Sequence, residues 1–467
     1  MFQILWVSFL VLGLASPALA ERGEFLGYDQ QIEIEDQTFI DCTVLEGGAR
    51  THCERLATAR ERAKQIPIRT FDHRVGKRHI PYREFVLVAY DPETDRWHDI
   101  VFGMPIRVER CPQHNVLLVP RSGSSTDYHV NRLRGCSLNK LVFEVQYQGK
   151  ELLVYGAKHL LFTYEKLHPI WGGRTVELIK EVMYLSTPKH LVHRELAQAG
   201  RNLLMQAIDQ VLIELSALRV PSRAYPGKLV TDQIPAETIA NLILAEQTDP
   251  CFLADRPSFC RTLIPTVPYE SEDEVRDAVK AEFAVNGLSA FRYLRSSANA
   301  RGVLQFTDNR TEKYAGTYTV VLALYPEARL DPDFRRGTES LRNQIKAAAL
   351  LLDLELANPK LPDWVRLTFL LDPELGLLFP GSAYNGGASQ SHQLARLMER
   401  FLRHEGMHLD ELMSQGLPWE QFEHFLSQPG HGLKAETLGY IKKIIKNWHY
   451  LSRHRPKVRS DFDGVLG

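Results

Sequence analysis

The spacing of apolar residues changes once along the chain, near residue 185. Before this point, apolar and polar residues alternate with a period of two in residues 141–147 and 151–155, which is typical of half-buried strands. Gln148 and Gly149 stand between these segments, and the glycine favours the tight turn of a hairpin. The region is therefore predicted to be rich in β-structure. Further strands are expected at 31–35, 85–90, 100–108 and 116–120, and a short helix at 53–65.

Beyond residue 185, apolar residues recur every three or four positions, which is the spacing of an amphipathic helix. The clearest stripe consists of Leu196, Gly200, Leu203, Ala207, Val211 and Leu215. Further helices are expected at 236–246, 272–285, 337–356, 392–404 and 434–450. The predicted fold class is α+β, with a β-rich N-terminal domain followed by an α-helical domain.

The length of 467 residues exceeds one typical domain, so two domains are expected. The change of period places the β-rich domain, whose role the sequence does not indicate, at residues 21–185. A connecting helix and linker occupy residues 186–230, since the segment 221–226 has the composition of a loop. The helical domain then spans residues 231–467.

Residues 1–20 have the pattern of a secretory signal peptide. An apolar stretch is followed by Pro17 and by an Ala-Leu-Ala site at 18–20, which predicts cleavage before Glu21. No Lys or Arg precedes the apolar stretch, so an uncleaved anchor is the alternative. No later segment has the roughly 20 apolar residues of a membrane helix. The expected location is periplasmic or secreted, in a bacterium, with no membrane span after cleavage.

The net charge bears on the possible partners of the protein, and the cysteine content bears on its disulfides. The 56 basic and 57 acidic residues leave a formal net charge of −1, which does not favour nucleic acid as a partner. Six cysteines in an exported chain predict disulfides, for which 15 pairings are possible. Neighbours in the sequence suggest Cys42–Cys53, Cys111–Cys136 and Cys251–Cys260. A cysteine zinc site is the competing interpretation, although the chain has no C-x-x-C pair.

Glu246 stands at the end of an apolar helix face that includes Ile239, Leu242 and Ala245. A carboxyl group beside buried residues loses hydration, which raises its pKa toward the range of a general acid. A solvated glutamate at a helix end has the same local sequence. The segment defines a catalytic site only together with others.

Three such segments follow in order. Residues 302–305 read Gly-Val-Leu-Gln after a run of small residues, 383–387 read Ala-Tyr-Asn-Gly-Gly, and 436–441 read Glu-Thr-Leu-Gly-Tyr-Ile. Together with the preceding glutamate they resemble the motifs of the soluble lytic transglycosylases, a lysozyme-like family that acts on bacterial cell walls. The resemblance covers roughly residues 235–450.

The resemblance implies a lysozyme-like catalytic domain that cleaves the β-1,4 bond between MurNAc and GlcNAc in peptidoglycan glycan strands, with formation of 1,6-anhydro-MurNAc. It implies no metal and no cofactor. Glu246 would act first as acid and then as base, and the Tyr384 hydroxyl would hold its carboxyl group. The implied substrate-binding residues are Gly302, which permits close backbone approach, Gln305, whose amide can donate and accept, Asn385, which would also brace its turn, and Tyr440.

Three departures leave alternatives open. Gln247 follows the glutamate where the family usually has Ser, and the gaps from Glu246 to Gly302 and from Gly387 to Glu436 are long. Glu282 lies closer to Gly302 and is the alternative catalytic residue. A non-catalytic peptidoglycan-binding protein on the same fold is the alternative function.

Residues 404–408, His-Glu-Gly-Met-His, match a different motif, H-E-x-x-H. On one helix, this spacing places two imidazoles one turn apart for Zn²⁺, with Glu405 as general base. Gly406 opposes that interpretation, since a glycine inside a helix costs about 1 kcal/mol. A zinc metallopeptidase is therefore a further alternative.

Overall fold

The computed structural model of the protein describes residues 41–75, 78–105, 119–120, 127–134, 142–167, 174–185, 192–248, 271–294, 300–308, 315–428, 430 and 432–453. Thr38–Gly467 form one compact unit. Its fold combines an antiparallel, curled sheet with helices, which confirms the predicted α+β class. The domain boundaries stay a prediction, and the signal peptide at residues 1–20 lies outside the described residues.

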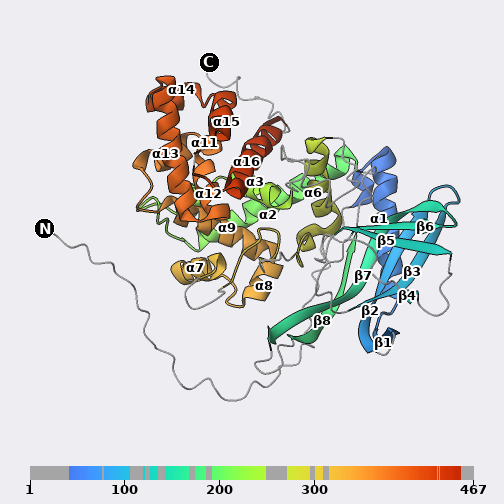
Figure 1. The fold of residues 1–467 in the computed structure, drawn as a ribbon. Helices are drawn as coiled ribbons and strands as arrows, with labels where there is room; N and C mark the ends of the chain where they lie inside the picture. Colours follow the sequence, from blue (N-terminus) through green and yellow to red (C-terminus); the bar gives the residue numbers. More distant parts are fainter. Residues whose placement is uncertain are drawn as a thin grey trace, which may run out of the picture. The chain divides into compact units, whose positions relative to one another are not determined.

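The described strands form one eight-stranded sheet. They are β1 (Thr70–Val75), β2 (Arg78–Asp91), β3 (Arg96–Pro105), β4 (Val119–Pro120), β5 (Tyr128–Arg134), β6 (Val142–Tyr147), β7 (Lys150–Leu167) and β8 (Arg174–Leu185). The order is β4-β3-β2-β7-β6-β5, with β1 paired to β2 and β8 to β7 (Figure 1). All these pairings are antiparallel.

The predicted hairpin is confirmed. Tyr147 of β6 pairs with Lys150 of β7, and the two residues between them have φ of 51° at Gln148 and 81° at Gly149. Two positive φ values are the geometry of the turn that best matches the twist of paired strands. The strand expected at 85–90 lies within β2, and those expected at 100–108 and 116–120 overlap β3 and β4 at residues 100–105 and 119–120. Residues 106–108 and 116–118 lie outside the described residues. The strand expected at 31–35 lies outside the described residues.

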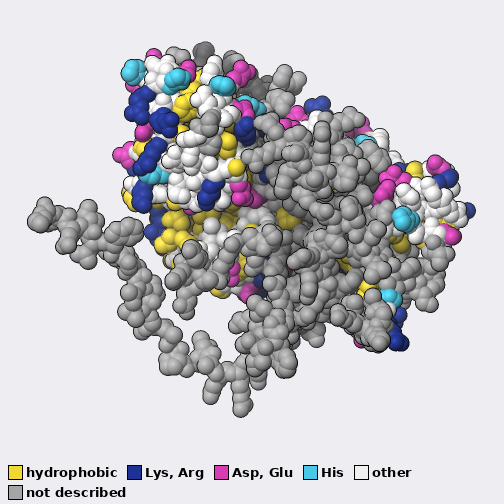
Figure 2. All heavy atoms as spheres, in the orientation of Figure 1, with side chains coloured by type: hydrophobic (Ala, Val, Ile, Leu, Met, Phe, Trp, Pro, Cys, Tyr) yellow, Lys and Arg dark blue, Asp and Glu magenta, His cyan; other side chains and the backbone are white. Residues whose placement is uncertain are grey.

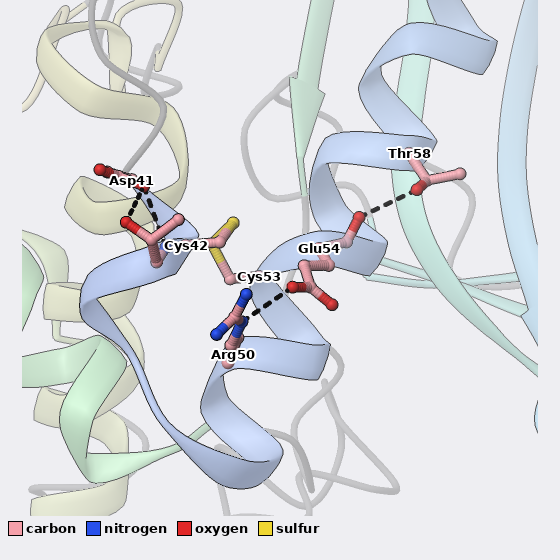
Figure 3. The surroundings of a disulfide bond; sticks show 7 residues. Asp41, Cys42, Arg50, Cys53, Glu54 and Thr58 are labelled. Atoms are coloured by element: carbon pink, nitrogen blue, oxygen red, sulfur yellow. Dashed lines mark hydrogen bonds and ion pairs between the residues drawn. A yellow bond between two sulfur atoms is a disulfide. The ribbon is translucent and has the colours of Figure 1, made fainter.

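Helix α1 (Gly47–Gln65) packs against the sheet and includes the predicted helix at 53–65. A disulfide joins Cys53, which α1 buries, to Cys42 in the preceding 3-10 turn (Figure 3). Asp41 caps that turn by accepting a hydrogen bond of 2.9 Å from the backbone N–H of Thr43. The first predicted disulfide is thus confirmed. The other four cysteines lie outside the described residues.

The described helices after the sheet are α2 (Arg194–Ala217), α3 (Ala236–Gln247), α6 (Glu272–Asn286), α7 (Thr317–Leu324), α8 (Phe334–Glu339), α9 (Leu341–Leu356), α10 (Asp363–Leu371), α11 (Pro373–Gly376), α12 (Leu378–Gly386), α13 (Ala388–Glu405), α14 (Leu409–Gln415), α15 (Trp419–Ser427) and α16 (Ala435–Arg453). The prediction of a single helix at 337–356 is therefore wrong, because the helix is interrupted at Ser340. The Ser340 side chain accepts a hydrogen bond from the backbone N–H of Asn343, and so caps a new helix.

Helix α9 lies in the main hydrophobic core, where Ile345, Leu350 and Leu352 are fully buried. A helix that is apolar on most sides is suited to such a position. Helix α13 is amphipathic instead, with Leu394 and Phe401 buried and its arginines exposed. Figure 2 shows Lys and Arg side chains on the side where α13 lies. Among the helices of the described ranges, none is both long and apolar enough to cross a membrane.

Candidate functional site

Glu246 lies in the last turn of α3 and is half-buried. The helix around it is almost entirely enclosed, and Ile239, Leu242 and Ala245 are fully buried. The predicted apolar helix that ends in a glutamate is therefore present. Its carboxyl group lies at the boundary between the core and the surface.

Helix α16 fixes the position of this end of α3. The Asn241 side chain donates a hydrogen bond of 2.9 Å to the carbonyl oxygen of Ile444. The Lys443 ammonium donates to the carbonyl oxygens of Ala245, at 3.0 Å, and Thr248, at 2.8 Å. Lys443 was not among the residues identified from sequence. The sequence offered one indication of its position: Lys443 follows Tyr440 by three residues on a predicted helix, so the two side chains lie on the same face.

The segment 301–306 forms a tight turn, closed by hydrogen bonds between the main chains of Arg301 and Phe306. Gly302 is buried in this turn with a φ of +73°. A Cβ atom there would lie 2.3 Å from Nε2 of Gln344 and 2.4 Å from the carbonyl oxygen of Thr338. Glycine is required because protein atoms approach so closely. A sugar contact through Gly302 stays a prediction.

Two glutamines hold this turn from opposite sides. The Gln344 amide accepts a hydrogen bond of 3.0 Å from the backbone N–H of Leu304 and donates one of 2.7 Å to the carbonyl oxygen of Thr338. The Gln247 amide donates to the carbonyl oxygen of Val303. Gln247 thus has a structural role, because its side chain ties the end of α3 to the turn.

Tyr384 lies in α12, and its hydroxyl donates a hydrogen bond to the carbonyl oxygen of Leu304. Its ring also packs edge-on against Phe306, with 6.1 Å between the centroids. Burial, and then the charge of Glu246, raise the pKa of Tyr384 well above its usual value. Glu246 is therefore close to Tyr384. The hydroxyl proton goes to Leu304 in the structure, and a role of this hydroxyl in holding the carboxyl group stays a prediction.

Tyr440 of α16 also lies close to Glu246. Its pKa is raised well above the usual value by burial, and then by the charges of Glu246 and Tyr384. The buried Tyr440 hydroxyl makes no hydrogen bond with the residues that the structure describes. The rings of Tyr440 and Tyr384 are nearly parallel, with 6.4 Å between their centroids. Tyr440 is only 4% exposed, so its predicted contact with sugar stays a prediction.

Gln305 and Asn385 both lie half-buried beside these residues. The Gln305 amide donates a hydrogen bond of 2.6 Å to the carbonyl oxygen of Gly302, which braces its own turn. The side-chain oxygen of Asn385 is buried and accepts no hydrogen bond from the residues that the structure describes. Substrate binding by either residue stays a prediction.

Glu282, the alternative catalytic residue, belongs to a different cluster. The Asn286 amide donates a hydrogen bond of 2.8 Å to Glu282 and also exchanges two hydrogen bonds with the main chain of Leu185 in β8. Burial raises the pKa of Glu282 to about 7, and the Asn286 hydrogen bond opposes this shift. The interactions described for Glu282 thus lead toward the sheet. Glu246 interacts with Tyr384, Tyr440 and Lys443 instead.

The H-E-x-x-H motif does not lie on one helix. Gly406, with a φ of 66°, ends α13 directly after Glu405. His408 is extended and stands at the N-terminus of the next helix, α14. The two imidazoles are therefore not one helical turn apart. The described ranges contain no group of three or more His, Cys, Asp or Glu residues placed to hold a metal ion.

No protein-family model, curated protein or solved structure matches the chain. The resemblance to lytic transglycosylases therefore rests on the four motifs alone. In the structure these motifs lie close together. Tyr384 and Tyr440 are both near Glu246, and the turn 301–306 is bound by Tyr384 and by Gln247, the residue after Glu246.

Proposed function

We propose that the protein is a peptidoglycan lytic transglycosylase, exported by a bacterium to the periplasm or beyond. The observation that carries the proposal is the convergence of Glu246 with Tyr440, Tyr384 and the turn 301–306. These four segments are far apart in the sequence. A carboxyl group at the edge of an apolar core, next to a phenol, is suited to proton transfer.

The proposed reaction needs one carboxyl group and no water. Glu246 donates its proton to the glycosidic oxygen as the bond between MurNAc and GlcNAc breaks, while the N-acetyl group of the substrate assists at the anomeric carbon. The Glu246 carboxylate then takes the proton from the C6 hydroxyl of MurNAc. The C6 oxygen attacks the anomeric carbon, which closes the 1,6-anhydro ring and returns Glu246 to its protonated form.

The residues around Glu246 have supporting roles in this proposal. Tyr440 orients the carboxyl group, and Tyr384 fixes the turn 301–306 against α12. Gln247 ties the same turn to the helix that carries Glu246. The acid–base group and the wall of the site are thereby held in one arrangement, as proton transfer over hydrogen-bond distance requires.

Digestion of purified sacculi, followed by mass spectrometry of the products, tests the proposal. Anhydro-MurNAc ends are the expected product. Reducing ends would indicate a hydrolase, and an intact glycan with cut peptides would indicate a peptidase. Binding to sacculi without any product would indicate a non-catalytic peptidoglycan-binding protein, and each of these three results would contradict the proposal.

A further inference from the structure

Lys443 is a buried cation in the interior of α16, with only 8% of the residue exposed. Its ammonium group donates hydrogen bonds to the carbonyl oxygens of Ala245 and Thr248, which flank Glu246 and Gln247 in the sequence. Carbonyl groups at the C-terminal end of a helix carry a partial negative charge. The ammonium group therefore stabilises the end of α3 at which Glu246 lies.

Burial of an ammonium group is costly unless negative charge compensates it. Burial lowers the pKa of Lys443, whereas Glu246, and after it Glu436, act in the opposite direction. Of the two carboxylates, Glu246 therefore has the larger electrostatic effect on this buried cation. By reciprocity, Lys443 must favour the ionised form of the Glu246 carboxyl group.

We propose that Lys443 is a positioning residue for Glu246: it holds the end of α3 in place and stabilises the ionised carboxylate. The role in catalysis rests on the proposed function. Within the described ranges, Tyr384 from α12 and Tyr440 from α16 also act electrostatically on Glu246, and Glu436 from α16 acts on Lys443.

In the proposed reaction, a cation near Glu246 helps the carboxyl group to change its protonation state. Glu246 must first donate a proton and then accept one, so neither protonation state can be strongly favoured. Burial beside the α3 core favours the protonated acid, and Lys443 favours the carboxylate. The opposition of the two effects allows one carboxyl group to perform both steps.

Substitution of Lys443 by Met tests the proposal through the titration of Glu246. The carboxyl carbon of Glu246 is followed by ¹³C NMR in glutamate-labelled protein, and its resonance is assigned as the one that E246Q lacks. K443M is expected to raise the apparent pKa of Glu246 by at least about 1. The matched control is K442M, because Lys442 lies on the same helix but pairs with Glu423 at 3.0 Å. An unchanged Glu246 titration in K443M overturns the proposal.

A reciprocal measurement needs no change at Lys443 and covers the case in which K443M does not fold. In E246Q the Lys443 side chain loses the carboxylate that has the larger electrostatic effect on it, so its pKa, measured by NMR of labelled lysine, is expected to fall below that of the wild type. An unchanged Lys443 pKa in E246Q contradicts the pairing.

Neither titration depends on enzymatic activity, so the two proposals can fail separately. If the titrations shift as expected and the wild-type protein yields no anhydro products, the pairing stands and the proposed function is wrong. If the wild-type protein is active and the titrations do not shift, the role of Lys443 is wrong. For an active enzyme, K443M is expected to move the alkaline limb of the pH–rate profile upward by the same amount as the Glu246 pKa.

Discussion

The Tyr384 hydroxyl donates its hydrogen bond to the carbonyl oxygen of Leu304, across 80 positions of sequence. This contact joins α12 to the turn 301–306, and Tyr440 lies close to Glu246 as well. The two tyrosine rings are nearly parallel, and the charge of Glu246 acts on both phenols. Tyr384 holds the turn that borders the candidate site, whereas we expect Tyr440 to orient the carboxyl group.

This division predicts different consequences for the two phenol-to-phenyl substitutions. Y384F leaves the Leu304 oxygen without its donor and is expected to lower the free energy of unfolding by about 1–2 kcal/mol. Y440F removes the phenol hydroxyl that we propose orients the Glu246 carboxyl group and is expected to lower kcat/KM on glycan strands by about tenfold or more. Denaturant unfolding and a muralytic assay on both variants check these effects.

The two variants serve as controls for each other. A Y440F protein with the wild-type rate would show that Tyr440 does not orient Glu246. A Y384F protein with unchanged stability would show that the contact with Leu304 does not hold the turn.

Gln247 offers a second test of how the site is held. Q247M keeps the length of the side chain but cannot donate to the Val303 oxygen, so the free energy of unfolding is expected to fall by about 1–2 kcal/mol. Q247E keeps the shape and places a carboxylate oxygen against the carbonyl, so its loss is expected to be larger. Chemical denaturation of the three proteins measures the series. Equal stability of Q247E and the wild type would contradict the described contact.

The sequence predicted the regular elements well, because their signals are local. The alternation around Gln148 and Gly149 specified the hairpin, and the stripe that begins at Leu196 specified α2. An error arose where one residue ends a helix, because Ser340 divides the helix expected at 337–356. Gly406, which opposed the zinc interpretation in the sequence, ends α13 between the two histidines of that motif.

The candidate site was less accessible to sequence analysis, because its contacts are long-range. The order of the motifs predicted that Glu246, Tyr384 and Tyr440 belong to one site. It could not predict which partner each side chain contacts. The Lys443 contacts with Ala245 and Thr248 span 198 and 195 residues. A lysine on an amphipathic helix does not reveal such partners before the fold is known.

Glu282 predicts a pH dependence of stability. Folding raises its pKa from 4.5 to about 7. Between these values the folded protein retains a proton that the unfolded chain has released, so the free energy of unfolding falls as the pH rises from 4.5 to 7. Unfolding midpoints measured across this range should fall less steeply in E282Q. Burial also raises the pKa of Glu355 to about 7, so the slope that remains in E282Q should decrease further with E355Q. Identical slopes in wild type and E282Q would refute the assignment.

The helical core is expected to be sensitive to the loss of the buried Asp353 carboxylate. Its carboxylate is fully buried and accepts hydrogen bonds from the Ser222 hydroxyl at 2.5 Å, from the Arg223 backbone N–H at 2.7 Å and from the Tyr325 hydroxyl at 2.7 Å. D353A leaves three donors without an acceptor and should cost about 3 kcal/mol or more of stability. S222A removes one of the three and should cost about 1 kcal/mol. Similar unfolding midpoints for the two variants would contradict this network.

The most direct test of the central claim compares wild type, E246Q and E282Q in one digestion of purified sacculi, with anhydro-MurNAc products measured by mass spectrometry. Glutamine keeps the shape of each side chain and removes its acid–base chemistry. Anhydro products are expected from the wild type and from E282Q, with a loss of about a hundredfold or more in E246Q. Full activity of E246Q, together with loss of activity in E282Q, would contradict this claim.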